Sequence, residues 1–201
     1  MTTRALDLVE DWPARRLAVA VVAADGSTEM TGAHDEIFAL ASLTKLETAM
    51  AVLVAAEEGT VDLDEPVTEA GATVADLLGH SSGIAPDSPE QLSSPRSRRI
   101  YSTAAYDTVA SLVSDRAAMP FARYLHEAVF APLGMRHSRL LGSAGADAVG
   151  TITDLIRLVA AWRAPRLVHD STLARATTAW LPELDGVLPG CGGRPLGLGT
   201  G

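Results

Sequence analysis

A serine and a lysine three positions apart are the first side chains in this sequence that could act together in a reaction. Ser42 and Lys45 open an apolar stretch with helical spacing, and residues three apart on a helix share a face. Their hydroxyl and amine can come within hydrogen-bonding reach, which makes a nucleophile with its own base. At a helix start, the free amide N–H of Ser42 and the positive end of the helix dipole would also face an oxyanion formed in acyl transfer.

Lys45 is the only lysine among the 16 Lys and Arg residues of the chain. Arginine cannot serve as this base because its guanidinium stays protonated, whereas a desolvated lysine ammonium can lose a proton near neutral pH. A Ser-Xaa-Xaa-Lys sequence alone is weak evidence, since a serine that caps a helix before an exposed lysine is common. The solitary lysine and the apolar helix that would desolvate it favour a catalytic pair here.

Tyr101 is the next candidate, because a phenol close to a Ser–Lys pair can relay a proton to a leaving group. It follows a basic turn at residues 96–99 and precedes a predicted helix. A tyrosine at a helix start is more often a packing residue, so a catalytic role for Tyr101 depends on what lies beside it.

The elements that must position these residues begin with a hairpin and a long helix. Residues 17–23 are alanine and β-branched residues that turn at Asp25 and Gly26 toward residues 28–31, which predicts an antiparallel hairpin. From Ser42, apolar residues recur at helical spacing up to Gly59. This pattern predicts a helix of about four turns, apolar around much of its girth and therefore buried between two lobes.

Further helices are expected along the rest of the chain, separated by loops rich in glycine and proline. They are predicted at residues 74–78 with Thr73 as cap, 104–118, 121–130, 154–162 with Thr153 as cap, and 171–180. From Pro182 onward glycine and proline dominate. Because an isolated hairpin is marginally stable in water, we expect more strands, a covering helix or another copy of the chain to cover its edges.

Composition restricts the classes of partner. The 201 residues are 47% hydrophobic and 20% charged, which is ordinary for a globular chain of one domain or two small lobes sharing a core. A net charge of −9 argues against nucleic acid and against anionic membranes as partners. The sequence shows neither the apolar core of a signal peptide nor an apolar run of membrane-spanning length, so we expect a soluble, cytoplasmic protein.

Neither a metal nor a cofactor is expected from the motifs. The five histidines show no metal-ligand spacing, and Asp62, Asp64 and Glu65 are too few for a calcium loop. No glycine-rich phosphate loop follows a predicted strand and opens a helix. Cys191 is the only cysteine, so an internal disulfide cannot form.

Five segments together resemble the β-lactamase-like serine hydrolases, which include class C β-lactamases, D-alanyl-D-alanine carboxypeptidases and related esterases. In the order and spacing of that family the chain carries FALASLTK (38–45), EEGTVDLDEPV (57–67), LLGHSSG (77–83), YST (101–103) and PLGM (132–135). The resemblance covers most of residues 17–160. It implies an acyl-enzyme formed on Ser42, with Lys45 as the base and Tyr101 as the proton relay.

The resemblance also implies the fold. We expect an α/β fold of the α+β type, like that of β-lactamases and penicillin-binding proteins, in which an antiparallel sheet lobe, incomplete here, lies beside an all-helical lobe. Residues 1–201 would form a single domain. Residues 1–59 and about 148–201 would supply the sheet lobe, and about 60–147 the helical lobe.

Two departures from the family pattern bear on substrate binding. Thr103 stands where the family usually has an asparagine, and its hydroxyl is shorter and offers one donor where the amide offers two. The third family motif, a Lys- or His-Thr-Gly on a strand that supplies an oxyanion N–H and pairs with substrate, is expected later than the end of this chain. Gly199-Thr200-Gly201 lacks the preceding Lys or His, and we interpret it as a coincidence.

A competing motif lies in the same region. Gly79-His80-Ser81-Ser82-Gly83 satisfies G-x-S-x-G, which in α/β-hydrolases forms a strand-to-helix turn that exposes the serine. Residues 74–78 before it are typical of a helix, and Pro86 and Pro89 after it prevent the required helix. We interpret this segment as a loop at the mouth of a cleft.

The sequence therefore predicts a serine hydrolase that acts on a small ester, amide or lactam, with an ester mildly favoured by a cytoplasmic location. The alternative is a non-catalytic or truncated family member that binds a ligand or a partner. Losing one oxyanion donor alone costs ~2.7–4 kcal/mol, and a missing substrate-binding strand should cost more. A homo-oligomer could cover the exposed strand edges.

Overall fold

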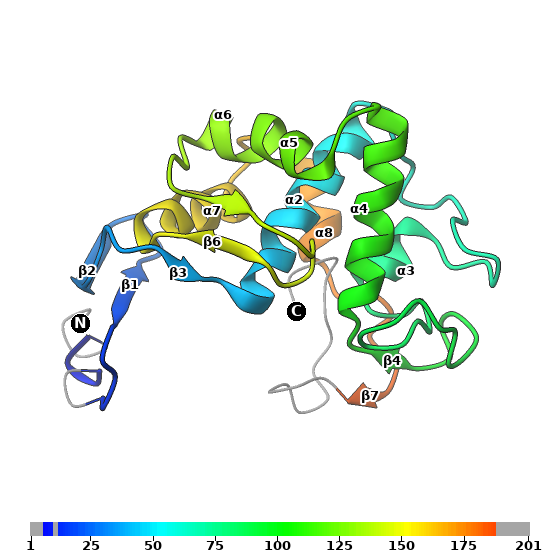
Figure 1. The fold of residues 1–201 in the computed structure, drawn as a ribbon, viewed down its shortest axis with the longest axis horizontal. Coiled ribbons are helices and arrows are strands. Elements are labelled where there is room, and N and C mark those ends of the chain that lie inside the picture. Colours follow the sequence, from blue (N-terminus) through cyan, green and yellow to red (C-terminus); the bar gives the residue numbers. More distant parts are fainter. Residues whose placement is uncertain (1–5, 10–11, 188–201) are drawn as a thin grey trace.

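A computed structural model describes residues 6–9 and 12–187 of the chain. Cys191 and Gly199-Thr200-Gly201 lie outside the described residues. Helix α2, Thr44–Glu57, runs through the middle of the molecule (Figure 1). To one side lie the strand pairs β1–β2 (Ala18–Val22 and Thr28–Gly32) and β3–β6 (Phe38–Ala39 and Ala148–Gly150) and helix α7 (Ile152–Arg163), and to the other lie helices α3 (Val74–Leu78) and α4 (Thr103–Ala117). The fold is thus a mixed α/β arrangement, as predicted.

The predicted hairpin is confirmed. Strand β1, Ala18–Val22, pairs antiparallel with β2, Thr28–Gly32. Between them the Asp25 carboxylate accepts hydrogen bonds from the backbone N–H and the hydroxyl of Ser27, at 2.9 and 2.7 Å. Gly26 has a φ of 87°, a conformation that glycine adopts without strain. Helix α7 packs on β1, so a helix covers part of this hairpin.

A second sheet positions the segment before Ser42. Its strand order is β3-β6-β5, all antiparallel, with β3 at Phe38–Ala39, β5 at Arg139–Leu140 and β6 at Ala148–Gly150. The ladder continues past β3, because the Leu40 N–H donates to the Ala148 carbonyl at 2.9 Å. Residues 38–40 are therefore held against a strand about 110 positions later in the chain.

A third pair of strands joins two other distant segments. Strand β4, Arg99–Ile100, pairs in parallel with β7, Gly186–Val187. The segment from Pro182, expected to be irregular from its glycine and proline content, therefore contains a short strand. Sequence periodicity cannot reveal a strand of two residues, because its alternation is too short to recognise.

Helix α2, Thr44–Glu57, forms the centre of the core, and residues 47–55 are all buried. It packs against α4, α5 and η2. The helices around it are α3, Val74–Leu78; α4, Thr103–Ala117; α5, Phe121–Leu125; η2, a π-helical turn at His126–Phe130; α6, Ala131–Leu133; and α8, Asp170–Thr177. The predicted apolar, buried helix is confirmed, as are the predicted helices over most of their lengths.

Two helix starts show how local capping is decided. Thr73 caps α3 in a capping box with Asp76, as predicted. The predicted cap of α7 was wrong: α7 is Ile152–Arg163, and its cap is Thr151, whose hydroxyl accepts from the Asp154 N–H at 3.2 Å. The sequence offers two threonines at this point. Thr151 is the one that places an acidic residue at the third helical position, while Thr153 lies within the first turn.

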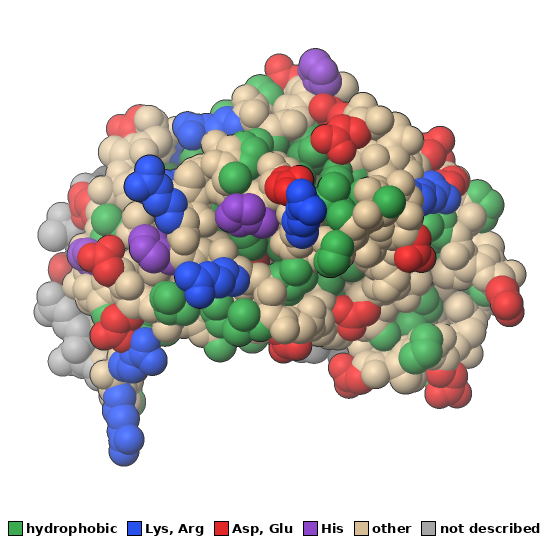
Figure 2. All heavy atoms as spheres, turned by 45° about the horizontal axis from the view of Figure 1, so that its top comes forward, with side chains coloured by type: hydrophobic (Ala, Val, Ile, Leu, Met, Phe, Trp, Pro, Cys, Tyr) green, Lys and Arg blue, Asp and Glu red, His purple; other side chains and the backbone are tan. Residues whose placement is uncertain are grey.

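Charges of both signs are mixed on the surface in the face drawn in Figure 2, where Asp and Glu side chains are scattered around Arg and His side chains. Among the helices of residues 6–9 and 12–187, none combines the length and the apolar character needed to cross a membrane. The division into a sheet lobe and a helical lobe at the predicted boundaries stays a prediction.

Candidate active site

Ser42 lies in a tight turn between the sheet and the central helix. This 3₁₀ turn, η1, spans Ala41–Leu43, and α2 begins only at Thr44, so the helix starts two residues later than predicted. Ala41 has a φ of 45°, which residues with a Cβ rarely adopt. Such strain persists where the surroundings impose it, here the strand ladder before the turn and the buried helix after it. Ser42 itself is exposed.

Lys45 is in the first turn of α2 and is only 4% exposed. Its ammonium donates to the Gly145 carbonyl at 2.7 Å and to the Thr103 hydroxyl at 3.2 Å. Within the described residues, no hydrogen bond joins Lys45 to Ser42. Ser42 and Lys45 therefore lie close together in the sequence, but the Lys45 ammonium is bound to oxygen atoms of Thr103 and Gly145.

Aromatic rings complete the surroundings of Lys45. Its Nζ lies 4.6 Å from the ring centroid of Tyr101 and 5.5 Å from that of Tyr106. A cation over an aromatic face is attracted by the ring quadrupole, and more strongly where water is excluded. Tyr106 is buried, and its hydroxyl donates to the Leu78 carbonyl at 3.0 Å. The contact shown by Tyr101 is thus through its ring face.

One cavity of about 280 Å³ brings the predicted catalytic residues together. Its lining is Leu40, Ser42, Leu43, Lys45, Leu46, His80, Tyr101 and Tyr106. Thr103, predicted to bind substrate, does not line this cavity but reaches it through its hydrogen bond to Lys45. His80 and Tyr106 were not predicted as site residues. Their only signal in the sequence was their position in or next to segments that resemble the family.

A second cavity, of about 580 Å³, shares Tyr101 with the first. Thr103, Leu92 and Pro86 are among its lining residues. Tyr101 therefore lines both cavities, and Thr103 lines the larger, mainly apolar one.

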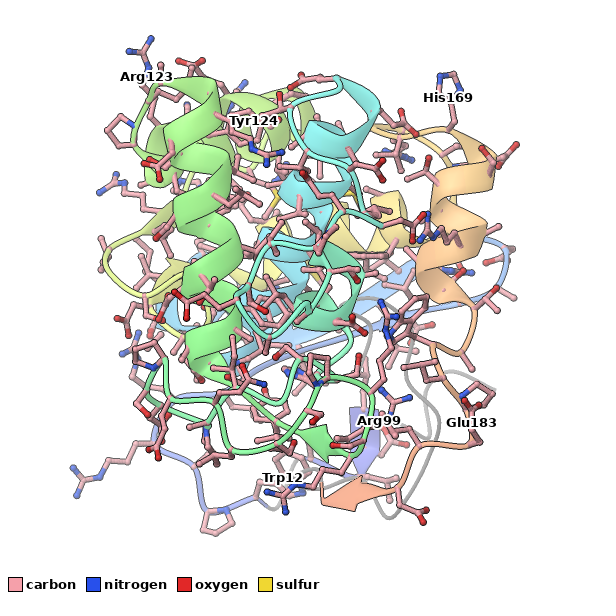
Figure 3. All side chains as sticks on the ribbon, turned by 90° about the vertical axis from the view of Figure 1, so that its right-hand side faces the viewer. Trp12, Arg99, Arg123, Tyr124, His169 and Glu183 are labelled. Carbon is pink, nitrogen blue, oxygen red and sulfur yellow. The ribbon has the colours of Figure 1, made fainter. Side chains whose placement is uncertain are left out.

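Arg99 fixes one side of this second cavity. It is 4% exposed, and its guanidinium donates to the Gly79 carbonyl at 2.7 Å and to the carbonyls of Trp180 and Leu181. Arg99 is the first residue of β4, and Figure 3 shows it near the segment that carries Glu183. Burial lowers the pKa of Arg99, an effect that Glu183 opposes. The contacts tie the chain after α8 to the loop after α3.

A cavity of about 730 Å³, larger than these two, lies elsewhere, between the end of α2, the end of α4 and the start of α8. Two arginines at this cavity form ion pairs, Arg116 with Glu65 and Arg175 with Asp64. None of the predicted catalytic residues lines this cavity, so size alone does not identify the candidate site.

The competing G-x-S-x-G motif does not form a nucleophile turn. The segment before it is helix α3. Ser81 is fully buried; its hydroxyl donates to the Asp76 carboxylate at 2.7 Å and accepts from the Trp180 indole N–H at 3.1 Å. A serine engaged on both sides and closed to solvent cannot receive a substrate, so the interpretation of this segment as a loop is confirmed.

Among the residues that the structure describes, no three His, Cys, Asp or Glu side chains gather closely enough to hold a metal ion.

Comparison with known proteins identifies the family of the chain. The sequence model of the Beta-lactamase family matches residues 7–201. The chain belongs to the Beta-lactamase family. A β-lactamase from Mycobacterium bovis is 41% identical, with a TM-score of 0.93 over 97% of this chain and 74% of that chain. A search of curated proteins found no match.

Two solved structures of lower sequence identity show only that the fold is similar. The octameric penicillin-binding protein homologue from Pyrococcus abyssi is 17% identical, with a TM-score of 0.82 over 98% of this chain and 63% of that chain. The D-amino acid amidase from Ochrobactrum anthropi SV3 is 19% identical, with a TM-score of 0.71 over 81% of this chain and 70% of that chain. This Beta-lactamase family chain thus spans 63% to 74% of the length of the three similar proteins.

Proposed function

We propose that this protein is a serine hydrolase that cleaves an ester, amide or lactam through an acyl-enzyme on Ser42. Lys45 in its neutral form accepts the Ser42 proton, Tyr101 relays a proton to the leaving group, and Thr103 helps to position the substrate. The observation that carries the proposal is the single cavity of about 280 Å³ that Ser42, Lys45 and Tyr101 line together.

The proposed reaction starts with attack of the Ser42 Oγ on the substrate carbonyl carbon, while the hydroxyl proton passes to the Lys45 Nζ. The bond from that carbon to the leaving atom then breaks, and the leaving atom takes a proton through Tyr101. Water hydrolyses the resulting ester and regenerates the serine. Lys45 must turn from the Gly145 carbonyl toward Ser42 for the first step, and catalytic hydrogen bonds often tighten only when substrate binds.

The similar proteins suggest which substrates to test first. Two of them are a β-lactamase and a D-amino acid amidase, so lactams and amides stand beside esters. The shared Tyr101 wall supports a substrate that extends from Ser42 into the second, mainly apolar cavity. We therefore propose amides or esters with an apolar substituent.

One observation favours a second candidate function, binding without catalysis. The Lys45 ammonium is occupied by Gly145 and Thr103 and makes no hydrogen bond to Ser42 within the described residues. In that case the cavity would hold a ligand of the same chemistry without forming a covalent bond.

Covalent labelling separates the two functions. The protein is incubated with a fluorescent penicillin and, separately, with p-nitrophenyl butyrate, and intact mass and released p-nitrophenol are measured. We expect a mass increase equal to one acyl group that disappears in Ser42→Ala. The matched control is Ser111→Ala, an exposed serine on α4, which should keep full labelling.

Labelling that persists in Ser42→Ala would place the nucleophile elsewhere. No adduct and no turnover in the unmodified protein, together with saturable, reversible binding of the penicillin by fluorescence anisotropy, would establish binding without catalysis.

A further inference from the structure

His80 forms part of the wall of the Ser42 cavity and touches the face of a predicted catalytic residue. It is 3% exposed, and its ring centroid lies 4.5 Å from that of Tyr101 and 5.4 Å from that of Tyr106. Both ring pairs are tilted, by 36° and 39°. These separations lie within the range of favourable aromatic pairs. The Tyr101 ring thus contacts both the His80 imidazole and the Lys45 ammonium.

His80 also bonds the backbone on both sides of Tyr101. The Ile100 N–H donates to the His80 carbonyl at 2.9 Å, and the Ser102 N–H donates to the His80 Nδ1 at 3.2 Å. Ile100 and Ser102 are the two sequence neighbours of Tyr101. A single residue therefore fixes the backbone before Tyr101, the backbone after it and the ring between them.

The hydrogen bond from Ser102 also determines the tautomer of His80. A nitrogen that accepts from an N–H uses its lone pair and carries no proton, so the proton of the neutral ring lies on Nε2. Burial, and then the positive charges of Lys45 and Arg99, lower the pKa of His80 to about 3. The ring is neutral at the pH values at which an acyl-enzyme would form.

The loop that presents His80 is anchored on each side. The preceding Gly79 carbonyl accepts from Arg99 at 2.7 Å, and the following Ser81 hydroxyl donates to the buried Asp76 at 2.7 Å. Between these anchors His80 has a φ of 58°. A residue with a Cβ holds this conformation only when its surroundings require it, and here the anchors direct the imidazole toward Tyr101.

We propose that His80 is a positioning residue for Tyr101, holding its backbone and its ring so that the phenol can relay a proton between the Ser42 site and the leaving group. The assignment rests on the proposed role of Tyr101 in the hydrolase reaction. His80 itself transfers no proton in this reaction.

Two substitutions separate the two kinds of contact. His80→Asn keeps a short acceptor where Nδ1 lies and tolerates a positive φ. His80→Phe keeps a ring but leaves the Ser102 N–H without a partner. For the ester or lactam that labels Ser42, we expect kcat to fall about 30-fold in His80→Phe and no more than about 5-fold in His80→Asn, with KM changed less than about 3-fold in both.

Val129→Ala is the control for a merely structural effect. Val129 is fully buried in η2 and lines neither cavity at Tyr101. Its truncation should lower the melting temperature without changing kcat. Unchanged kcat in His80→Phe, or the same loss of kcat in Val129→Ala as in His80→Phe, overturns the positioning role.

A spectroscopic readout keeps this inference separate from the hydrolase proposal. The chain has three tyrosines, so the ¹⁹F signal of fluorotyrosine at position 101 can be assigned with Tyr101→Phe. We expect this signal to shift or broaden in His80→Phe and to stay unchanged in Val129→Ala. In addition, ¹⁵N spectra of histidine should show the neutral Nε2–H form of His80 between pH 5 and 8.

If the unmodified protein neither labels nor turns over, the hydrolase proposal fails, while a ¹⁹F shift confined to His80→Phe still supports the contact with Tyr101. A ¹⁹F signal unchanged in His80→Phe, or an Nδ1–H tautomer, overturns the positioning role even in an active enzyme.

Discussion

The Lys45 ammonium donates a hydrogen bond of 3.2 Å to the hydroxyl of Thr103, although the two residues are 58 positions apart. Thr103 is the first residue of α4, so its hydroxyl is held at the base of a helix that packs against α2. The position that the family usually fills with asparagine is therefore linked to the proposed base.

This relationship predicts the effect of removing the Thr103 hydroxyl. Thr103→Val has nearly the same shape but cannot accept from Lys45, and a hydrogen bond to a charged group contributes about 1.5–3 kcal/mol. We expect the rate of Ser42 acylation to fall about 10-fold or more, measured with the ester that labels the protein. Thr103→Ser, which keeps the hydroxyl, should retain most of the rate; equal rates in Thr103→Val and the unmodified protein would contradict the role.

Substitutions of Lys45 test whether it acts as a base or only as a positive charge. Lys45→Arg keeps the charge, but its guanidinium cannot lose a proton near neutral pH. We expect acylation of Ser42 to fall at least about 100-fold in Lys45→Arg, within the range that a general base contributes. Acylation at the original rate in Lys45→Arg would show that a positive charge is sufficient.

The stability of Lys45 variants gives an independent check. Lys45→Met leaves the Gly145 carbonyl without its donor, and an unsatisfied buried polar group costs about 1–3 kcal/mol. We expect a lower free energy of unfolding in urea for Lys45→Met. The control is Arg15→Met, because Arg15 is exposed, and it should leave the midpoint unchanged.

The ion pair of Arg96 with Asp76 should matter for the loop that carries His80. Asp76 is fully buried, and burial by itself raises its pKa, but hydrogen bonds from Arg96, Thr73 and Ser81 outweigh burial and lower the pKa below its ordinary value. Arg96 has a φ of 62°, and alanine also carries a Cβ, so Arg96→Ala changes the ion pair and leaves the backbone strain.

For Arg96→Ala we expect a loss of about 1–2 kcal/mol in the free energy of unfolding at pH 7, reduced because the Arg96 side chain is 48% exposed. A carboxylate with a lowered folded pKa stabilises the fold above its unfolded pKa, and this contribution disappears as the pH falls through the folded pKa. The difference between Arg96→Ala and the unmodified protein should therefore vanish in acid. A difference that stays constant down to pH 2 would contradict the ion-pair explanation.

The buried carboxyl of Glu47 should make the stability of the fold depend on pH in the opposite direction. It is fully buried in α2, and its carboxylate oxygens have no hydrogen-bond partner among the described residues. Burial, with a smaller contribution from Asp154, raises the pKa of Glu47 to about 8. Because the folded pKa lies above the unfolded one, the unfolded chain releases this proton first, and stability falls as the pH rises from about 4.5 to about 8.

We expect the free energy of unfolding to fall by at most about 5 kcal/mol over that interval, because one pKa unit corresponds to about 1.4 kcal/mol. Glu47→Gln should have a flatter profile, and the exposed Glu29→Gln should follow the unmodified protein. Denaturation in urea at pH 5 and pH 8 measures both. Equal pH dependence in Glu47→Gln and the unmodified protein would rule out a buried, neutral carboxyl.

Local features of the fold were predictable because neighbouring residues determine them. Asp25 and Gly26 specify the hairpin turn, and Thr73 with Asp76 specifies the start of α3, since each set lies within a few positions. The prediction of Thr153 as the cap of α7 was wrong because any threonine at a helix start satisfies the general rule for a cap residue. Thr151 is the cap, and its hydroxyl accepts from the N–H of Asp154 at the third helical position.

The sequence alone determined which chemical groups form the candidate site. Lys45, the only lysine, lies three positions after Ser42 at the start of an apolar helix, and Tyr101 lies in a segment that resembles the family. Only the tertiary structure decided what those groups contact. The Gly145 carbonyl reaches Lys45 from 100 positions away, and His80 bonds the backbone on both sides of Tyr101. Periodicity reports which face of an element is buried, whereas these contacts depend on how separate elements pack, which no local pattern contains.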